Sequence, residues 1–267
     1  MPQRHGPDRR TVLRGAAVAP GAAWAGGAFG VSPAYADPAA AAKPPMYFRA
    51  DWGARPPSTP IQVLAAPPSF VVVHHTATAN SADHSEGHAL ALSRSIQNFH
   101  MDSNGWADAG QQFTISRGGH IMEGRDRAVP AVREGQHCVG SHVANNNSTC
   151  VGIENEGTYM DEGPTQALTD SLVSTLAWLC GAYGLNPQEA ILGHRDFNAT
   201  ACPGDVLYAM LPDLRNAVTG VMLAQGLEIG TRTVPAQDQP TYPPVPRDEP
   251  LREFVHGPGR GADDFTR

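Results

Sequence analysis

The chain has 267 residues, of which 41% are hydrophobic and 17% are charged, and its formal net charge is −7. This length suits one domain of ordinary size with extensions, or two small domains. The acidic balance excludes nucleic acid as the expected partner, because phosphate contacts require clustered lysine and arginine.

The first 36 residues have the pattern of an export signal. Arg9 and Arg10 are followed by an Ala/Gly-rich apolar stretch at 16–31 and by an Ala-Tyr-Ala cleavage site at 34–36. This order is typical of a twin-arginine signal peptide, and the alternative is a disordered basic N-terminus. The apolar stretch is shorter than the roughly 20 residues of a membrane helix, so we expect no membrane span and a secreted, extracytoplasmic protein. Removal of this segment, which holds four arginines and one aspartate, would bring the net charge to −10.

Three further regions follow. Residues 37–46 form an Ala/Pro-rich linker, and residues 47–225 contain the apolar periodic segments of one folded domain. Residues 226–267 are rich in Pro, Gly and charge with few large apolar side chains, so we expect a disordered tail.

Strand-like and helix-like segments alternate along the folded region. A β-branched run at 69–73 predicts a buried strand that ends at a His-His pair. Thr165 and Gly184 have the residue types of helix caps and bound one long amphipathic segment. Further strands are expected at 112–116, 121–124, 150–156 and 190–194, and helices at 85–101, 165–184 and 205–223.

The four cysteines are Cys138, Cys150, Cys180 and Cys202. Export would permit disulfides, and Cys138 and Cys150 flank a polar loop, so the sequence allows a local Cys138–Cys150 bridge. Cys180 lies in an apolar helical run and is expected to be a buried thiol.

Two histidines and a cysteine have the types and positions of metal ligands. His74 ends the buried strand at 69–73, His194 ends the short strand at 190–194, and Cys202 follows eight residues later. Imidazole and thiolate are preferred donors for Zn²⁺, and three protein ligands with a fourth position open describe a catalytic site. The alternative is a pair of ordinary loop histidines and a spare thiol.

Four separated motifs resemble the type-2 N-acetylmuramoyl-L-alanine amidases and the peptidoglycan recognition proteins of the same superfamily. They are WGARPP at 52–57, VVVHHTAT at 71–78, VGIENEG at 151–157, and GHRD with TACPG at 193–204. The resemblance implies an α/β fold in a single domain, with a central mixed sheet flanked by helices and zinc at the floor of a groove. It also implies that His74, not His75, is the first ligand, followed by His194 and Cys202.

The family's reaction is hydrolysis of the amide bond between the lactyl group of N-acetylmuramic acid and L-alanine. Peptidoglycan or muropeptide fragments are therefore the partners that the resemblance implies. In many relatives a tyrosine takes part, but the matching stretch DAGQQF at 108–113 has Gln111 in its place. A carboxamide cannot titrate, so the tyrosine role does not carry over, and Gln111 remains a candidate to hydrogen-bond the substrate.

Glu154 is the alternative candidate for the catalytic base. In the branch of amidases that trim anhydro-muropeptides, the matching glutamate resembles a base. Strand alternation places Glu154 and Glu156 on one face, and we expect Glu154 to face the zinc. The competing interpretation is a solvated or sheet-edge glutamate.

Two further residues match positions of interest in relatives. Thr200 lies two residues before Cys202, and its hydroxyl is a candidate to hydrogen-bond the oxyanion or the substrate carbonyl. The alternative is a threonine that is packed as a turn residue. His137 matches a histidine that often lines the groove, so we expect it to bind substrate, whereas His142 has the pattern of a surface loop residue.

Two other functions compete with a zinc amidase. A non-catalytic peptidoglycan-binding module would usually lose the cysteine ligand, which this chain keeps. A general zinc peptidase is disfavoured because the His-Glu-x-x-His motif is absent from the sequence.

Overall fold

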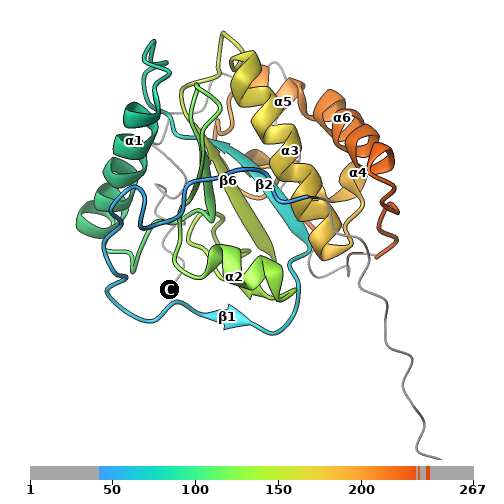
Figure 1. The fold of residues 1–267 in the computed structure, drawn as a ribbon, viewed down its shortest axis with the longest axis horizontal. Coiled ribbons are helices and arrows are strands. Elements are labelled where there is room, and N and C mark those ends of the chain that lie inside the picture. Colours follow the sequence, from blue (N-terminus) through green and yellow to red (C-terminus); the bar gives the residue numbers. More distant parts are fainter. Residues whose placement is uncertain (1–41, 233, 235–238, 241–267) are drawn as a thin grey trace, which may run out of the picture. The chain divides into compact units, whose positions relative to one another are not determined.

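The computed structural model describes residues 42–232, 234 and 239–240. The predicted signal segment 1–36 and most of the predicted tail lie outside the described residues. The described part folds around a five-stranded sheet of order β4-β3-β6-β2-β7, in which only β4 is antiparallel to its neighbour. Helices flank this sheet (Figure 1), so the α/β fold with a central mixed sheet is confirmed. None of the described helices is long and apolar enough to span a membrane.

The strands are short, and those at the centre are completely buried. A second, two-stranded sheet pairs β1 with β5 in antiparallel register. The bounds are β1 (Val63–Leu64), β2 (Phe70–His75), β3 (Phe113–Ile115), β4 (Ile121–Glu123), β5 (His137–Cys138), β6 (Cys150–Asn155) and β7 (Ile191–Gly193).

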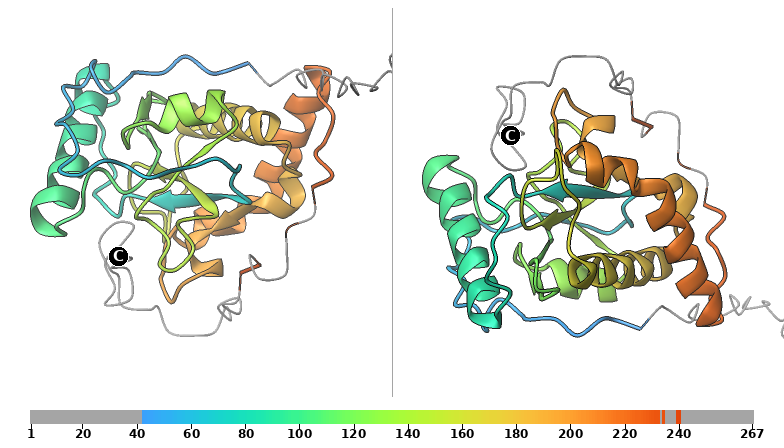
Figure 2. Two further views of the ribbon diagram at one scale, coloured as in Figure 1. Left: turned by 90° about the horizontal axis from the view of Figure 1, so that it is seen from below. Right: turned by 90° about the horizontal axis from the view of Figure 1, so that it is seen from above.

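The helices cover the sheet and its two edges. The edge strand β4 packs against α1, and the opposite edge strand β7 packs against α6. Figure 2 shows these two helices at opposite ends of the sheet. The bounds are α1 (Glu86–Asn98), η1 (Phe99–Ser103), α2 (Ala128–Arg133), α3 (Gln166–Tyr183), α4 (Pro187–Ala190), η2 (His194–Asp196), α5 (Asp205–Ala209) and α6 (Leu211–Ala224).

Alternation of side chains along β2 decides on which face of the sheet His74 lies. Val71 and Val73 belong to the main core with α3 and α6, whereas Val72 packs in a smaller cluster that includes Val143. Successive side chains of a strand point to opposite faces. His74 therefore shares the face of Val72, on the side of the sheet away from α3.

The predicted caps of the long helix are confirmed. The Thr165 side chain accepts a hydrogen bond from the backbone N–H of Leu168, and Gly184 ends α3 with a left-handed φ of 62°. The helix expected at 205–223 is two helices instead, α5 and α6. Pro212 lies in the first turn of α6, where its missing N–H is tolerated but cannot continue the hydrogen bonds of α5.

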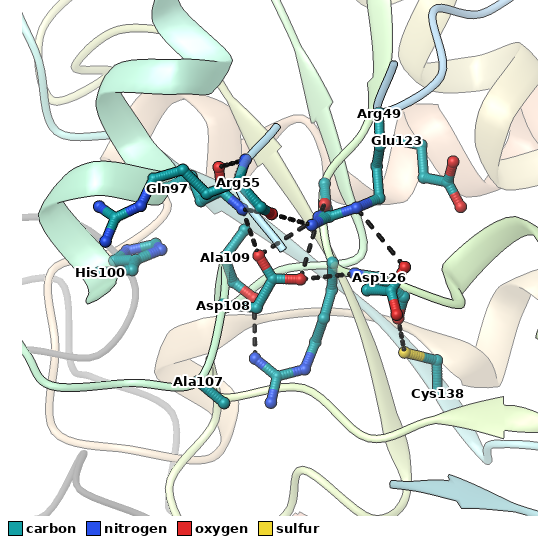
Figure 3. A network of polar contacts seen from close by, with 12 residues as sticks. Arg49, Arg55, Gln97, His100, Ala107, Asp108, Ala109, Glu123, Asp126 and Cys138 are labelled. Atoms are coloured by element: carbon teal, nitrogen blue, oxygen red, sulfur yellow. Dashed lines mark hydrogen bonds and ion pairs between the residues drawn. The ribbon is translucent and has the colours of Figure 1, made fainter. Parts of the chain in front are cut away.

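A buried carboxylate ties the segment before β1 to the rest of the fold (Figure 3). Asp108 is fully buried and lies 2.9 Å from the Arg49 guanidinium. It also accepts hydrogen bonds from the side chain of Gln97 in α1 and from the backbone N–H of Asp126 after β4. A buried charge is stable only with such partners, so this network fixes the segment against α1.

Candidate metal centre

The three predicted ligands meet at one end of the central strands. His74 is near the end of β2, and His194 begins η2 directly after β7, which is parallel to β2. Carboxyl ends of adjacent parallel strands lie at the same edge of a sheet, which brings the two rings to a centroid distance of 4.6 Å. The sulfur of Cys202 lies 3.6 Å from Nδ1 of His74, and one donor atom from each of the three buried residues lies within 4.8 Å of the others.

Arg195 holds the loop that returns Cys202 to the site. Its backbone N–H donates to the carbonyl of Cys202 at 3.1 Å, and its guanidinium donates to the carbonyl of Ala201. The guanidinium also lies 2.7 Å from the Asp205 carboxylate and stacks over the Tyr208 ring. Both ends of the loop are thereby fixed before α5 begins.

Burial lowers the pKa of two neighbouring histidines, His74 and His75. Desolvation, and then the neighbouring imidazoles of His194 and His142, hold the pKa of His74 well below its ordinary value. Desolvation and the charge of Arg195 lower the pKa of His75 to about 3. The backbone N–H of His75 points at the sulfur of Cys202 at 3.4 Å, which favours a thiolate. Neutral imidazoles and a thiolate are the protonation states that a zinc ion needs in its ligands.

The two predicted histidine ligands, His74 and His194, each have a polar neighbour in addition to the other ligands. Nε2 of His74 lies 3.0 Å from Nδ1 of His142, and Nε2 of His194 lies 3.1 Å from Oδ1 of Asn198. The prediction that His142 is a surface loop residue is wrong, because its side chain is 1% exposed. The glycine in the middle of β6, Gly152, was the sequence signal for it, because such a glycine often marks a close approach of another group.

Glu154 shares the sheet face of His74. The register pairs His74 with Glu154 and Glu154 with Thr114, and residues directly opposite each other project to the same face. The Glu154 side chain is 1% exposed, and its Oε2 has no hydrogen-bond partner among the described residues. Burial raises the pKa of Glu154 well above its ordinary value.

The other predicted site residues are buried in the same region. Gln111 donates to the Thr114 hydroxyl at 2.8 Å, which joins it to the face that carries Glu154. The Thr200 hydroxyl accepts from the backbone N–H of Cys202 at 3.2 Å. His137 is fully buried in β5, and its Nε2 lies 2.7 Å from the carbonyl of Asn147. Its substrate contact stays a prediction.

The Cys138–Cys150 disulfide that the sequence allowed is not present. Cys138 belongs to the two-stranded sheet, and its thiol donates to the carbonyl of Asp126 at 3.1 Å (Figure 3). Cys150 begins β6 in the main sheet and packs in the small cluster with Val72. The polar loop between the two cysteines therefore connects two different sheets, which the sequence spacing did not indicate. Burial raises the pKa of Cys138 to about 12, so its thiol stays protonated.

Comparisons with known proteins match this domain. A family model described as N-acetylmuramoyl-L-alanine amidase matches residues 64–205. The human N-acetylmuramoyl-L-alanine amidase is 34% identical over 169 residues, which are 63% of this chain and 28% of the human protein. The match to this human relative thus spans little more than a quarter of the relative's own length. Peptidoglycan-recognition protein LB of Drosophila melanogaster is 30% identical over 164 residues, or 61% of this chain and 66% of that protein.

The fold comparison agrees with the sequence comparison. The structure of a Drosophila PGRP-LB mutant in complex with tracheal cytotoxin has a TM-score of 0.55 and 29% sequence identity. The aligned region covers 62% of this chain and 92% of that one.

Proposed function

This chain belongs to the N-acetylmuramoyl-L-alanine amidase family, and on that premise we propose that it is a zinc-dependent peptidoglycan amidase. It hydrolyses the amide bond between the lactyl group of N-acetylmuramic acid and L-alanine. The observation that carries the proposal is the convergence of two imidazoles and a cysteine sulfur, those of His74, His194 and Cys202, at one buried position.

The donor set fits zinc. Its members are all borderline or soft ligands, and three protein ligands are the usual number at a catalytic zinc site. When bound there, zinc would supply a Lewis acid and lower the pKa of a water molecule to about 7.

Glu154 is the residue that we assign to proton transfer. It shares the face of His74, and burial raises the pKa of its carboxyl group, which makes its carboxylate a stronger base. It takes a proton from the attacking water as the new C–O bond forms. It then gives that proton to the alanine nitrogen as the C–N bond breaks, which leaves a free amine and a lactyl carboxylic acid. The acid then loses its remaining proton to solvent and becomes the carboxylate.

Three side chains are assigned to the substrate. The Thr200 oxygen accepts from the N–H of Cys202, so its hydroxyl proton remains available to donate to the carbonyl oxygen as negative charge develops there. Gln111 and His137 remain the proposed substrate contacts. A relative's structure in complex with tracheal cytotoxin supports a muropeptide as the ligand.

The test is mass spectrometry of defined muropeptides and of intact cell wall after incubation with the zinc-loaded protein. We expect products with a free L-alanine amine, no product after chelation, and recovery on addition of zinc. The Glu154→Gln variant should bind zinc normally and lose at least about a hundredfold in kcat, the usual scale for an acid–base residue. Near-native turnover of this variant would overturn the role of Glu154.

A second candidate function is a peptidoglycan-binding module that does not cut. The observation that favours it is Gln111, which stands where many relatives have a tyrosine of the catalytic site. Muropeptide binding without release of alanine amines, in protein shown to contain zinc, would support the module. Cleavage of casein but not of muropeptide would contradict both candidates.

A further inference from the structure

The environment of His74 determines which of its ring nitrogens carries the proton. Nε2 of His142 lies 3.1 Å from the carbonyl of Cys150, which can only accept, so Nε2 of His142 donates. A neutral imidazole carries one N–H, so Nδ1 of His142, which faces the ring of His74, accepts. The donor to this Nδ1 is Nε2 of His74, at 3.0 Å. Nδ1 of His74 is then the atom with the lone pair, and it lies toward Cys202.

The environment of His194 leads to the same tautomer by a different route. Oδ1 of Asn198 accepts from the backbone N–H of Ala144 at 3.1 Å, and its Nδ2 donates to the carbonyl of Ala144. Because one residue supplies both contacts, the orientation of the Asn198 amide is fixed. The oxygen therefore lies 3.1 Å from Nε2 of His194, which must donate. With its proton on Nε2, the neutral ring of His194 has its lone pair on Nδ1.

Two glycines provide the space for the ring of His142. A Cβ on Gly152, in the middle of β6, would lie 2.6 Å from Nδ1 of His142. A Cβ on Gly140 would collide with Cδ2 of the same ring. The ring thus fits a closely packed site on the sheet face that carries His74, and this packing fixes its position.

Residues of one loop position both His142, which contacts His74, and Asn198, which contacts His194. The Asn147 side chain accepts from the backbone N–H groups of His142 and Val143, at 2.7 and 2.9 Å. His142 then reaches His74, and Ala144, two residues later, holds Asn198.

We propose that His142 and Asn198 are positioning residues, which hold His74 and His194 as Nε2–H tautomers so that Nδ1 of each faces the metal. This inference rests on the proposed metal site. Groups that hydrogen-bond the second nitrogen of a ligand histidine fix its tautomer and orientation, and their loss typically weakens metal affinity about 10- to 100-fold.

The first test measures the tautomers without metal or substrate. Long-range ¹⁵N–¹H NMR spectra of the metal-free full chain, labelled in histidine, distinguish protonated from unprotonated ring nitrogens. We expect Nε2–H on both His74 and His194, and zinc should shift their Nδ1 resonances most. Nδ1–H on either ring would overturn the proposal.

The second test measures zinc affinity by competition with a chromophoric chelator. His142→Leu and Asn198→Leu, which remove the acceptors, should each weaken affinity about 10- to 100-fold. His142→Asn and Asn198→Asp keep an acceptor oxygen near the same place and should restore most of it. His120→Leu, a histidine outside this network, is the matched control. Unchanged affinity in both leucine variants, with folding verified by circular dichroism, would overturn the proposal.

Neither test depends on amidase activity. Normal tautomers and zinc affinity without turnover would contradict the proposed function alone, whereas turnover with an Nδ1–H tautomer would contradict this inference alone.

Discussion

Glu154 is an ionisable side chain in a position that penalises its charged form. The residue is 1% exposed, and desolvation is the cause of its raised pKa. The folded state therefore binds a proton at Glu154 that the unfolded state releases at lower pH. Stability from this group is fully present below the unfolded pKa and is lost as the pH rises through the higher folded pKa.

We predict that Glu154→Gln stabilises the metal-free protein in a pH-dependent way. At pH 4 the variant and the parent should have similar free energies of unfolding, because the parent carboxyl is largely protonated in both states. By pH 8 the variant should be more stable by at least about 1 kcal/mol, since each unit of pKa shift corresponds to roughly 1.4 kcal/mol. Urea unfolding in excess chelator measures the difference, and the exposed Glu189→Gln is the control. A difference that stays constant from pH 4 to pH 8 would refute the prediction.

The metal ligands could be predicted from the sequence because each lies in a short, recognisable sequence motif. His74 follows a β-branched run, and Cys202 lies in a motif that the family shares. His142 could not be placed in the same way. Its partner His74 is 68 residues away, and its own neighbours, several asparagines, are typical of a surface loop.

At the scale of elements, helix α3 shows how one terminal residue fixes an end. Gly184 adopts a φ of 62°, and a Cβ there would meet no atom within 4 Å. The constraint at this position is therefore on the backbone alone, since only glycine adopts the left-handed conformation readily.

We predict opposite effects for two glycine-to-alanine substitutions. Gly184→Ala should destabilise the protein by about 1 kcal/mol, because alanine is strained in the left-handed region. Gly220→Ala, at an exposed position within α6 that is also open within 4 Å, should stabilise it by about 0.5–1 kcal/mol through helix propensity. Urea unfolding at one pH measures both. Equal effects of the two substitutions would contradict the backbone explanation.

Long elements with strong periodicity could be predicted, and short ones could not. The helix at 165–184 has both caps and several turns in its pattern, whereas β1 and β5 have two residues each, too few for a period. The break between α5 and α6 had a signal in Pro212, which the apolar pattern on either side obscured.

At the scale of the whole domain, the candidate metal centre joins distant parts of the chain. His74 and Cys202 are separated by 128 residues and lie at the end of β2 and in the loop before α5. An ion bound by both, and by neither in the unfolded chain, stabilises the folded state by mass action.

We predict that zinc raises the midpoint of thermal unfolding relative to chelated protein. At a free concentration about a thousandfold above the dissociation constant, the stabilisation should approach 4 kcal/mol. Cys202→Ser should remove most of the effect, and magnesium at the same concentration should produce none, since it prefers oxygen ligands. Equal midpoints with zinc and with chelator would contradict a zinc site.

No disulfide joins the four cysteines, all of which lie in the described part of the chain. The described fold therefore contains no covalent cross-link between its cysteines, and Cys202 is a thiol rather than half of a disulfide. A reductant that would dismantle a small cross-linked domain leaves this one intact and keeps the sulfur of Cys202 in the state that binds metal.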